Sequence, residues 1–379
     1  MKIGFDVAQT CTERAGCAWY ADSVLRAMVE CAPQNEYILY HQFGDWINER
    51  TSAGTYVDHA SVRMPSWDLD AKTSRELWSE GRTRTAFFGS PEIVQSNSFQ
   101  AVQVPGAKLV FVIYDVSFWV HPEFTTESNR LNCQAGVLRA LERADAFLFI
   151  SESGMREFEK ILPGWLARRH KPAAAIPLAS RIPVPAKRKK GGKFWLAVGS
   201  MEPRKNYTAL FSAIDLYWRR STNPLPTRIV APKGWRNDDL TKRAAELENQ
   251  GRVSLLGYVA EDRLTALYQN ALALVFVSWY EGFGLPVLEA MQAGCPVICS
   301  DRSSLPEVGG DSVMYINPDS PESICEAMLR LEGDPGLQDR LLEKGQLRAR
   351  LFTWQRTAQE TLQFYERVLE GSEMEPPSG

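Results

Sequence analysis

The sequence predicts two doubly wound α/β domains in tandem, and three observations lead to that fold class. Short apolar runs alternate with longer amphipathic stretches along the chain, which is typical of parallel sheets covered by helices on both faces. At 379 residues the chain is too long for one hydrophobic core, since domains average roughly 150 residues. A segment rich in proline, lysine and glycine, 183–192, separates the two series and is the predicted linker.

The first predicted domain spans 1–182 and opens on a strand. Its apolar runs are too short for helices, and its amphipathic stretches follow the 3.6-residue period. The expected strands are Lys2–Val7, Glu36–Tyr40, Leu109–Tyr114 and Ala146–Ser151, and the expected helices are Ala18–Glu30 and Ser128–Arg143.

The second predicted domain spans 193–352 and repeats the same alternation. The expected strands are 194–200, 227–232, 253–258, 273–278 and 296–300, with helices at about 206–219, at 263–270 and up to Ala293. A last amphipathic helix is predicted over 353–372, after which two prolines end the regular structure.

Composition and charge exclude several classes of protein. The chain has 43 Lys plus Arg against 46 Asp plus Glu, so it lacks the basic excess of a nucleic-acid binder. Its seven cysteines are scattered and never form Cys-x-x-Cys, which argues against a disulfide framework or a zinc site. No apolar run approaches the roughly 18 residues of a transmembrane helix, and the first residues resemble a strand rather than a leader. We therefore expect a cytoplasmic protein.

The densest motif follows the strand predicted at 273–278. It reads as a strand, a glycine turn and a helix, with Pro286 suited to the first helical turn and Gly294 to the cap beyond the helix. The amides of Gly282, Phe283, Gly284 and Leu285 would then lie at the positive end of a helix dipole, where phosphate or sugar hydroxyls bind.

Two glutamates accompany this motif. Glu281 lies on the turn and Glu289 about one turn inside the helix, so they could flank one extended ligand. The alternative is structural: Glu289 would be a surface residue, and Glu281 would interact with the helix dipole.

A second motif follows the strand predicted at 194–200. Ser200 ends that strand, and Arg204 and Lys205 come directly after it in the string MEPRKN. Two cations at the carboxyl end of a strand suit a diphosphate, because Arg offers a planar fork and Lys a compact charge. A solvated loop with an ordinary cationic pair is the alternative, but ligands of open α/β sheets bind at this end of the strands.

These strings resemble a known family. EGFGLPVLEA (281–290), VGSMEPRKN (198–206), LLGYV (255–259) and GCPVICSDRSSLPEVGGD (294–311) occur in the order and spacing of the retaining glycosyltransferases of family 4, most similarly the mannosyltransferase-like enzymes of bacterial surface polysaccharides. The resemblance covers essentially the whole second domain. It implies the GT-B fold: two Rossmann-like doubly wound domains facing a central cleft, with the last helix crossing back onto the first domain.

The resemblance implies roles in holding a nucleotide-sugar donor. Arg204 and Lys205 would stabilise the departing diphosphate, Glu289 would bind the ribose, and Glu281 would hold the donor sugar. Such a site needs neither a metal ion nor a cofactor. The further donor-binding residues would be Ser200, Tyr258, Val259, Gly282, Phe283, Gly284 and Leu285.

The first domain matches the family more weakly. The glycine-rich loop of the family appears as Gly16-Cys17-Ala18-Trp19-Tyr20, where only the first glycine is present. The His-Asp pair of the family appears as Tyr114-Asp115, so either Tyr114 supplies the polar contact, or Asp115 carries more of the catalytic role, or the chain is slow or inactive. By resemblance, Gly16, Trp19, Tyr20 and Tyr114 would bind the acceptor.

The function predicted on this basis is retaining transfer of a hexose to a glycan or lipid-linked saccharide in surface polysaccharide synthesis. GDP-mannose is the first choice of donor and UDP-glucose the alternative. A non-catalytic subunit that binds sugar nucleotides is the second interpretation. A dinucleotide oxidoreductase is a remote third one, because it would require a Gly-x-Gly-x-x-Gly motif directly after a strand, and none of the predicted strands is followed by it. Leu162–Lys171, with an aromatic and several cations, is the candidate for peripheral contact with the inner face of the cell membrane.

Overall fold

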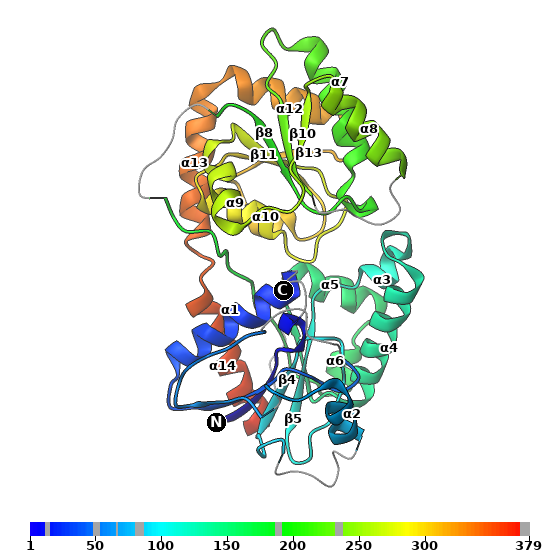
Figure 1. Ribbon diagram of the computed structural model, residues 1–379, viewed down its shortest axis with the longest axis vertical. Helices are drawn as coiled ribbons and strands as arrows, with labels where there is room; N and C mark the ends of the chain where they lie inside the picture. Colours follow the sequence, from blue (N-terminus) through cyan, green and yellow to red (C-terminus); the bar gives the residue numbers. More distant parts are fainter. Residues whose placement is uncertain are drawn as a thin grey trace. The chain divides into compact units, whose positions relative to one another are not determined.

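The computed structural model describes residues 1–11, 16–47, 54–65, 67–79, 87–185, 192–231 and 238–371. The chain divides into two compact units, each built on a parallel sheet with helices around it (Figure 1). The first unit is Met1–Leu178 with Trp354–Gly379, and the second is Ala179–Thr353. The predicted class of two doubly wound α/β domains is thus confirmed. The predicted linker falls after the division at Leu178, and 186–191 within it lie outside the described residues.

The sheet of the first unit has the strand order β3-β2-β1-β4-β5-β6-β7, with every pairing parallel. Its described strands are β1 (Lys2–Asp6), β2 (Glu36–Tyr40), β3 (Val62–Arg63), β4 (Ile93–Ser96), β5 (Lys108–Ile113), β6 (Ala146–Phe149) and β7 (Ala173–Ala175). Its described helices are α1 (Gly16–Cys31), α2 (Ala71–Ser79), α3 (Ser117–Val120), α4 (Glu127–Arg143), α5 (Glu152–Ile161), α6 (Trp165–Arg168) and α14 (Trp354–Glu370), with short 3₁₀ turns at Ala8–Cys11 and Pro122–Phe124.

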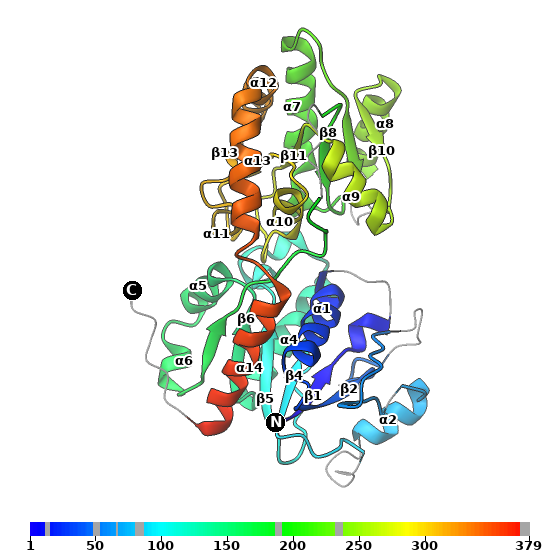
Figure 2. The same cartoon turned by 90° about the vertical axis from the view of Figure 1, so that its left-hand side faces the viewer.

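The last helix, α14, belongs to the first unit. It packs along α1, and the two lie side by side in both views (Figures 1 and 2). The amphipathic pattern of the tail explains this packing, because Phe364, Tyr365 and Ala358 are fully buried on one face of the helix.

The sheet of the second unit has the strand order β10-β9-β8-β11-β12-β13, again parallel throughout. Its described strands are β8 (Trp195–Val198), β9 (Thr227–Val230), β10 (Val253–Leu255), β11 (Ala273–Phe276), β12 (Val297–Ser300) and β13 (Met314–Ile316). Its described helices are α7 (Tyr207–Arg220), α8 (Asp238–Asn249), α9 (Glu261–Asn270), α10 (Leu285–Gln292), α11 (Leu305–Gly309), α12 (Pro321–Gly333) and α13 (Pro335–Ala349), with a 3₁₀ turn at Pro203–Lys205.

In both sheets the strand order reverses next to the first strand of the unit. In the second unit β8 and β11 are neighbours, but the chain leaves β8 toward β9 and leaves β11 toward β12 on the opposite side. The loops that follow β8 and β11 therefore diverge at their carboxyl ends. Such a switch point is where open α/β sheets bind ligands.

Candidate active site

Both motifs singled out in the second unit lie at this switch point. Arg204 and Lys205 follow β8, and Glu281 follows β11. The Lys205 ammonium donates a hydrogen bond of 2.6 Å to one oxygen of Glu281, and the Arg204 guanidinium donates one of 2.7 Å to the other. The two predicted cations and one of the two predicted carboxylates thus form a single cluster.

A further carboxylate, Glu202, fixes the orientation of the Arg204 side chain. It accepts a hydrogen bond of 3.0 Å from Arg204 Nε and another of 2.5 Å from the hydroxyl of Ser200. Because Glu202 holds Nε and Glu281 holds Nη1, the guanidinium plane is set from two sides. The sequence contained Glu202 inside the MEPRKN motif, but its spacing alone gave no sign of this contact.

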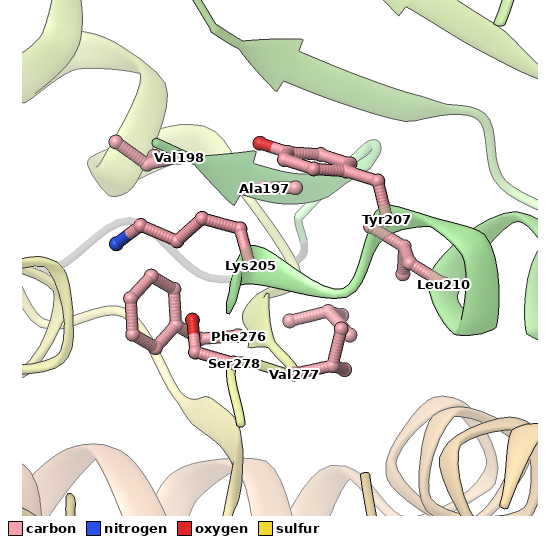
Figure 3. Close-up of a pocket in the computed structure, with 9 residues that line it drawn as sticks. Ala197, Val198, Lys205, Tyr207, Leu210, Phe276, Val277 and Ser278 are labelled. Carbon is pink, nitrogen blue, oxygen red and sulfur yellow. The ribbon is translucent and has the colours of Figure 1, made fainter. Parts of the chain in front are cut away.

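The turn that carries Lys205 is attached to the neighbouring strand. Asn206 adopts a left-handed conformation with φ of 55°, and its side-chain amide donates to the carbonyls of Val277 and Pro318. The Lys205 side chain extends over the ring of Phe276, with its nitrogen 4.7 Å from the ring centroid (Figure 3). Charge, ring and hydrogen bonds together hold the ammonium at the end of β11.

The pocket beneath Lys205 is too small to hold a nucleotide. Its cavity volume of about 10 Å³ lies far below the ~300–1,000 Å³ of ordinary ligand pockets. Its lining is mostly apolar and comes from β8, β11 and the start of α7: Ala197, Val198, Lys205, Tyr207, Leu210, Val275, Phe276, Val277 and Ser278 (Figure 3).

Electrostatics keep the Glu281 carboxylate ionised. Burial by itself raises the pKa of Glu281, but the adjacent charges of Lys205 and Arg204 outweigh burial and bring the pKa to about 2. Burial lowers the pKa of Lys205, and Glu281 opposes that change. Glu281 is therefore a hydrogen-bond acceptor at neutral pH and cannot act as a proton donor.

The turn from Glu281 to α10 is fastened by two serines. The Glu281 amide donates to the Ser303 hydroxyl at 2.9 Å, and the Ser304 hydroxyl lies 2.8 Å from the carbonyl oxygens of both Glu281 and Phe283. Gly284 precedes the helix with φ of 105°, where a Cβ atom would lie 2.7 Å from the Leu305 side chain. Only glycine fits this position without strain.

The helix that follows the turn has the predicted signals at both ends. Leu285 and Pro286 are its first two residues, and Gly294 lies just past its end with φ of 76°. Phe283 is buried against Phe352, so its ring is structural, whereas Gly282 and Leu285 are partly exposed. The positive end of the α10 dipole thus lies next to Glu281 and the two cations.

The second predicted carboxylate, Glu289, forms a separate part of the site. Its side chain is buried on α10, where one oxygen accepts a 2.9 Å hydrogen bond from the Tyr268 hydroxyl. The other oxygen is 3.9 Å from the guanidinium of Arg181. Burial raises the pKa of Glu289, while Arg181 and Tyr268 oppose that rise. No pattern in the sequence predicted a role for Arg181, which lies at the start of the second unit.

The residues predicted near the nucleotide base differ in exposure. Tyr258, beyond the end of β10, is 76% exposed, whereas Val259 is buried. An exposed ring beside the strand ends can stack on a planar base.

The acceptor residues predicted in the first unit occupy diverse environments. Gly16 is the first residue of α1 and is exposed, and Trp19 is partly exposed. Tyr20 and Tyr114 are buried and pack edge to face, 5.8 Å between ring centroids. Burial raises the pKa of both hydroxyls, and Tyr114 donates to the Asn97 carbonyl.

Asp115 is partly exposed just beyond β5, and its side chain contacts Ser117, the first residue of the short helix α3. One of its oxygens accepts hydrogen bonds from the amide and the hydroxyl of Ser117, at 2.8 and 2.7 Å. Its catalytic role stays a prediction.

The segment proposed for membrane contact is anchored in the core of the first unit. The Trp165 ring packs on Phe147, Leu166 is buried, and the Lys171 ammonium donates to the Ala144 carbonyl. In the described part of the chain, no helix has both the length and the apolar character needed to cross a bilayer. The described residues also contain no cluster of three or more side chains suited to a metal ion.

Comparison with known proteins shows which family the second unit resembles. The family described as glycosyl transferases group 1 matches residues 180–348. Residues 180–348 are thus similar to the glycosyl transferases of group 1. Those residues include the whole cluster around Glu281 as well as Glu289 and Arg181, and the chain is accordingly a glycosyltransferase.

Several related proteins are named mannosyltransferases. O-antigen chain mannosyltransferase B of Escherichia coli is 29% identical over 271 residues, which cover 68% of this chain and 70% of that protein. O-antigen chain mannosyltransferase RfbU of Salmonella typhimurium is 34% identical over 148 residues, 39% of this chain and 41% of that one. Against the serotype-specific mannosyltransferase WbdA of E. coli, 29% identical, 76% of this chain spans only 37% of that protein.

Solved structures share the fold over nearly the whole chain. Sucrose-phosphate synthase from Thermosynechococcus elongatus superposes with a TM-score of 0.70 at 19% identity, covering 98% of this chain and 100% of that one. HepE of Anabaena, solved with UDP and glucose, gives a TM-score of 0.68 at 16% identity, covering 97% and 99%. At these identities the likeness establishes the fold alone.

Proposed function

We propose that this glycosyltransferase moves a hexose from a nucleoside diphosphate sugar to a hydroxyl group of a glycan or lipid-linked saccharide during surface polysaccharide synthesis. The observation that supports it most is the cluster of Arg204, Lys205 and Glu281 at the switch point, beside the amino end of α10. A diphosphate requires fixed cations and a helix terminus, and its sugar requires an acceptor of hydroxyl protons.

The donor we propose is GDP-mannose, with UDP-glucose as the competitor. The names of the O-antigen mannosyltransferases support mannose. The UDP and glucose in the HepE structure are the reason to test the alternative. The exposed ring of Tyr258 can stack on either base and does not choose between them.

The chemistry we propose for the second unit is electrostatic. As the sugar departs, negative charge grows on the diphosphate, and Arg204 and Lys205 stabilise that charge from positions that Glu202 and Asn206 hold in advance. Glu281, ionised at neutral pH, accepts hydrogen bonds from the sugar hydroxyls. Retention would follow from attack of the acceptor on the face the diphosphate leaves, with the departing phosphate oxygen taking the acceptor proton. A trapped glycosyl-enzyme adduct would contradict this route.

We propose that transfer needs no metal ion. Arg204, Lys205 and the α10 terminus supply the positive charge that a divalent cation gives elsewhere. Turnover should persist in excess EDTA, and its loss with recovery on adding Mg²⁺ would refute the proposal.

The acceptor, by analogy with the family, would bind the first unit near Gly16, Trp19 and Asp115. The buried Tyr20 and Tyr114 would support this surface from beneath. Contact with an anionic membrane through Leu162–Lys171 would be purely electrostatic, since Trp165 packs into the core. Vesicle binding that survives high salt would contradict that view.

The experiment that tests the function is a transfer assay with GDP-mannose and UDP-glucose, each with a mixture of saccharide acceptors. Donor hydrolysis is followed in parallel. Wild type should release the nucleoside diphosphate from one of the two sugar nucleotides. Arg204→Gln should reduce the rate of that release by roughly a hundredfold or more, the usual effect of losing one hydrogen-bond donor to the transition state. Binding of the sugar nucleotide without either transfer or hydrolysis would instead support a non-catalytic subunit. This alternative is considered because position 114 is a tyrosine and not the histidine of the family.

A further inference from the structure

Arg181, in the segment that opens the second unit, connects two carboxylates of different exposure. Its Nη1 donates a 2.8 Å hydrogen bond to Glu261 at the start of α9, and its Nη2 lies 3.9 Å from Glu289 on α10. The side chain of Arg181 is 19% exposed, and that of Glu289 is 7% exposed. The guanidinium charge therefore acts on Glu289 with little screening by solvent.

The two oxygens of Glu289 have different surroundings. Oε2 accepts the hydrogen bond of the Tyr268 hydroxyl, which sets the rotation of the carboxylate. Oε1 accepts no hydrogen bond from any described residue and faces Arg181 only at ion-pair distance. An ionised oxygen that keeps its lone pairs is suited to accept protons from the hydroxyl groups of a ligand.

We propose that Arg181 is a positioning residue for Glu289: it keeps the Glu289 carboxylate ionised and its Oε1 open, so that the site selects a ribose diol over a 2′-deoxyribose. This inference rests on the proposed nucleotide-sugar function and deepens it. Arg181 itself does not touch the ribose. It acts through the charge of Glu289.

The charge balance around Glu289 explains why Arg181 is needed. The charged and titratable groups that face Glu289 are Arg181, Glu261 and Tyr268. Burial and Glu261 raise the pKa of Glu289, and Arg181 opposes them. Without Arg181, Glu289 would take up a proton at a higher pH, and its oxygen would become a weaker acceptor.

The experiment is a calorimetric titration of the full chain with GDP and with 2′-deoxy-GDP, at neutral and at mildly acidic pH. UDP and 2′-deoxy-UDP replace them if UDP is the nucleotide that binds. The variants are Arg181→Met and the conservative Arg181→Lys. Arg252→Gln is the matched control, because Arg252 is also partly buried and paired to a carboxylate, Asp215 at 2.7 Å, on a different part of the unit.

Arg181→Met should weaken GDP binding roughly tenfold, because the ribose hydrogen bond to Glu289 loses its charge assistance when the carboxylate takes up a proton. The affinity for 2′-deoxy-GDP should change much less, so the variant should no longer prefer GDP over 2′-deoxy-GDP. The loss of affinity for GDP should be larger at acidic pH. Arg181→Lys should recover most of the preference, and Arg252→Gln should keep all of it. In turnover, Arg181→Met should raise the donor KM and leave kcat nearly unchanged.

Equal weakening of both nucleotides in Arg181→Met, or no weakening at all, would overturn the role of Arg181 while leaving the proposed function intact. The two claims separate at the wild type. Failure of wild type to bind either GDP or UDP would overturn the proposed function, and with it this inference.

Discussion

Two glutamates eight positions apart in the sequence have opposite electrostatic environments. Glu281 contacts two cations directly, and its pKa falls to about 2 despite burial. Glu289 has one cation at 3.9 Å, and burial raises its pKa. The spacing of the motif could predict that both are functional. It could not predict this difference, because the partners Arg204, Lys205 and Arg181 come from distant segments.

The buried pair of Lys205 and Glu281 should be costly to break. Glu281→Gln leaves the Lys205 ammonium buried without its counter-charge, which costs on the order of 3–5 kcal/mol of unfolding free energy. Urea unfolding measures the loss. Asp311→Asn, in the exposed pair with Lys344, is the control and should leave the unfolding free energy nearly unchanged, because solvent screens that pair. Equal losses of unfolding free energy in the two variants would show that the buried pair is no more costly to break than the exposed pair.

Asp6 should make stability depend on pH in the first unit. Burial raises the pKa of Asp6 from 3.8 to about 6, although it accepts hydrogen bonds from the Ala8 and Asn97 amides and the Ser98 hydroxyl. The folded state therefore holds the Asp6 proton more tightly than the unfolded state does. The contribution of Asp6 to stability is full below 3.8, declines as pH rises and is lost above about 6.

Urea unfolding of wild type and Asp6→Asn across this pH range tests the sign. Wild type should lose stability relative to Asp6→Asn as pH rises from 4 toward 7, and the exposed Asp58→Asn should follow wild type. Parallel curves for wild type and Asp6→Asn would be evidence against the assignment.

Among the elements, the apolar and amphipathic patterns predicted most strands of the second unit to within a few residues, but only three of its described helices, α7, α9 and α10. The strand β4 was missed, although it lies in the middle of the first sheet between β1 and β5. Its four residues include Gln95 and Ser96, which are buried because their polar groups find partners in the fold. A hydrophobicity pattern cannot detect a strand whose buried polar residues are satisfied by hydrogen bonds that form only in the fold.

Gln95 also explains how the last helix is held. Its side-chain oxygen accepts a hydrogen bond from Tyr365 of α14, and its amide contacts Tyr20 of α1. Tyr365→Phe should lower the unfolding free energy by about 1–3 kcal/mol, because the buried Gln95 oxygen loses its donor. Chemical unfolding is the measurement, with the exposed Gln363→Ala on the same helix as control. An unchanged midpoint for Tyr365→Phe would argue against this attachment.

The turn before α10 requires glycine at position 284. Gly284→Ala should cost roughly 1–3 kcal/mol, since the left-handed backbone disfavours a side chain and the new Cβ meets Leu305. Donor affinity should fall as well, because the turn carries Glu281. Gly333→Ala in α12, where a Cβ meets nothing within 4 Å, should be neutral or slightly stabilising. Thermal unfolding with and without nucleotide compares the two, and equal shifts would refute the argument.

For the whole molecule, the alternation of patterns was enough to predict two doubly wound units, whereas the return of the last helix to the first unit was predicted from the family resemblance. The predicted linker began later than the division of the units, because Ala179, Ser180 and Ile182 are buried and Arg181 already pairs with residues of the second unit. That Arg204, Lys205 and Glu281 lie close together was predictable, because each follows a strand in a contiguous motif. The acceptor residues stay a prediction, and two of them, Tyr20 and Tyr114, are buried.

The central claim is that the switch point of the second unit binds a nucleoside diphosphate sugar through Arg204, Lys205 and Glu289. The most direct test is thermal stabilisation of the full chain by GDP, UDP, ADP and TDP, repeated with Arg204→Ala and Glu289→Ala. One nucleotide, with GDP as the first expectation, should raise the melting temperature of wild type. This shift in melting temperature should be smaller in both variants. A nucleotide-dependent shift that both variants retain in full would place the nucleotide elsewhere, and no shift with any nucleotide would contradict the claim outright.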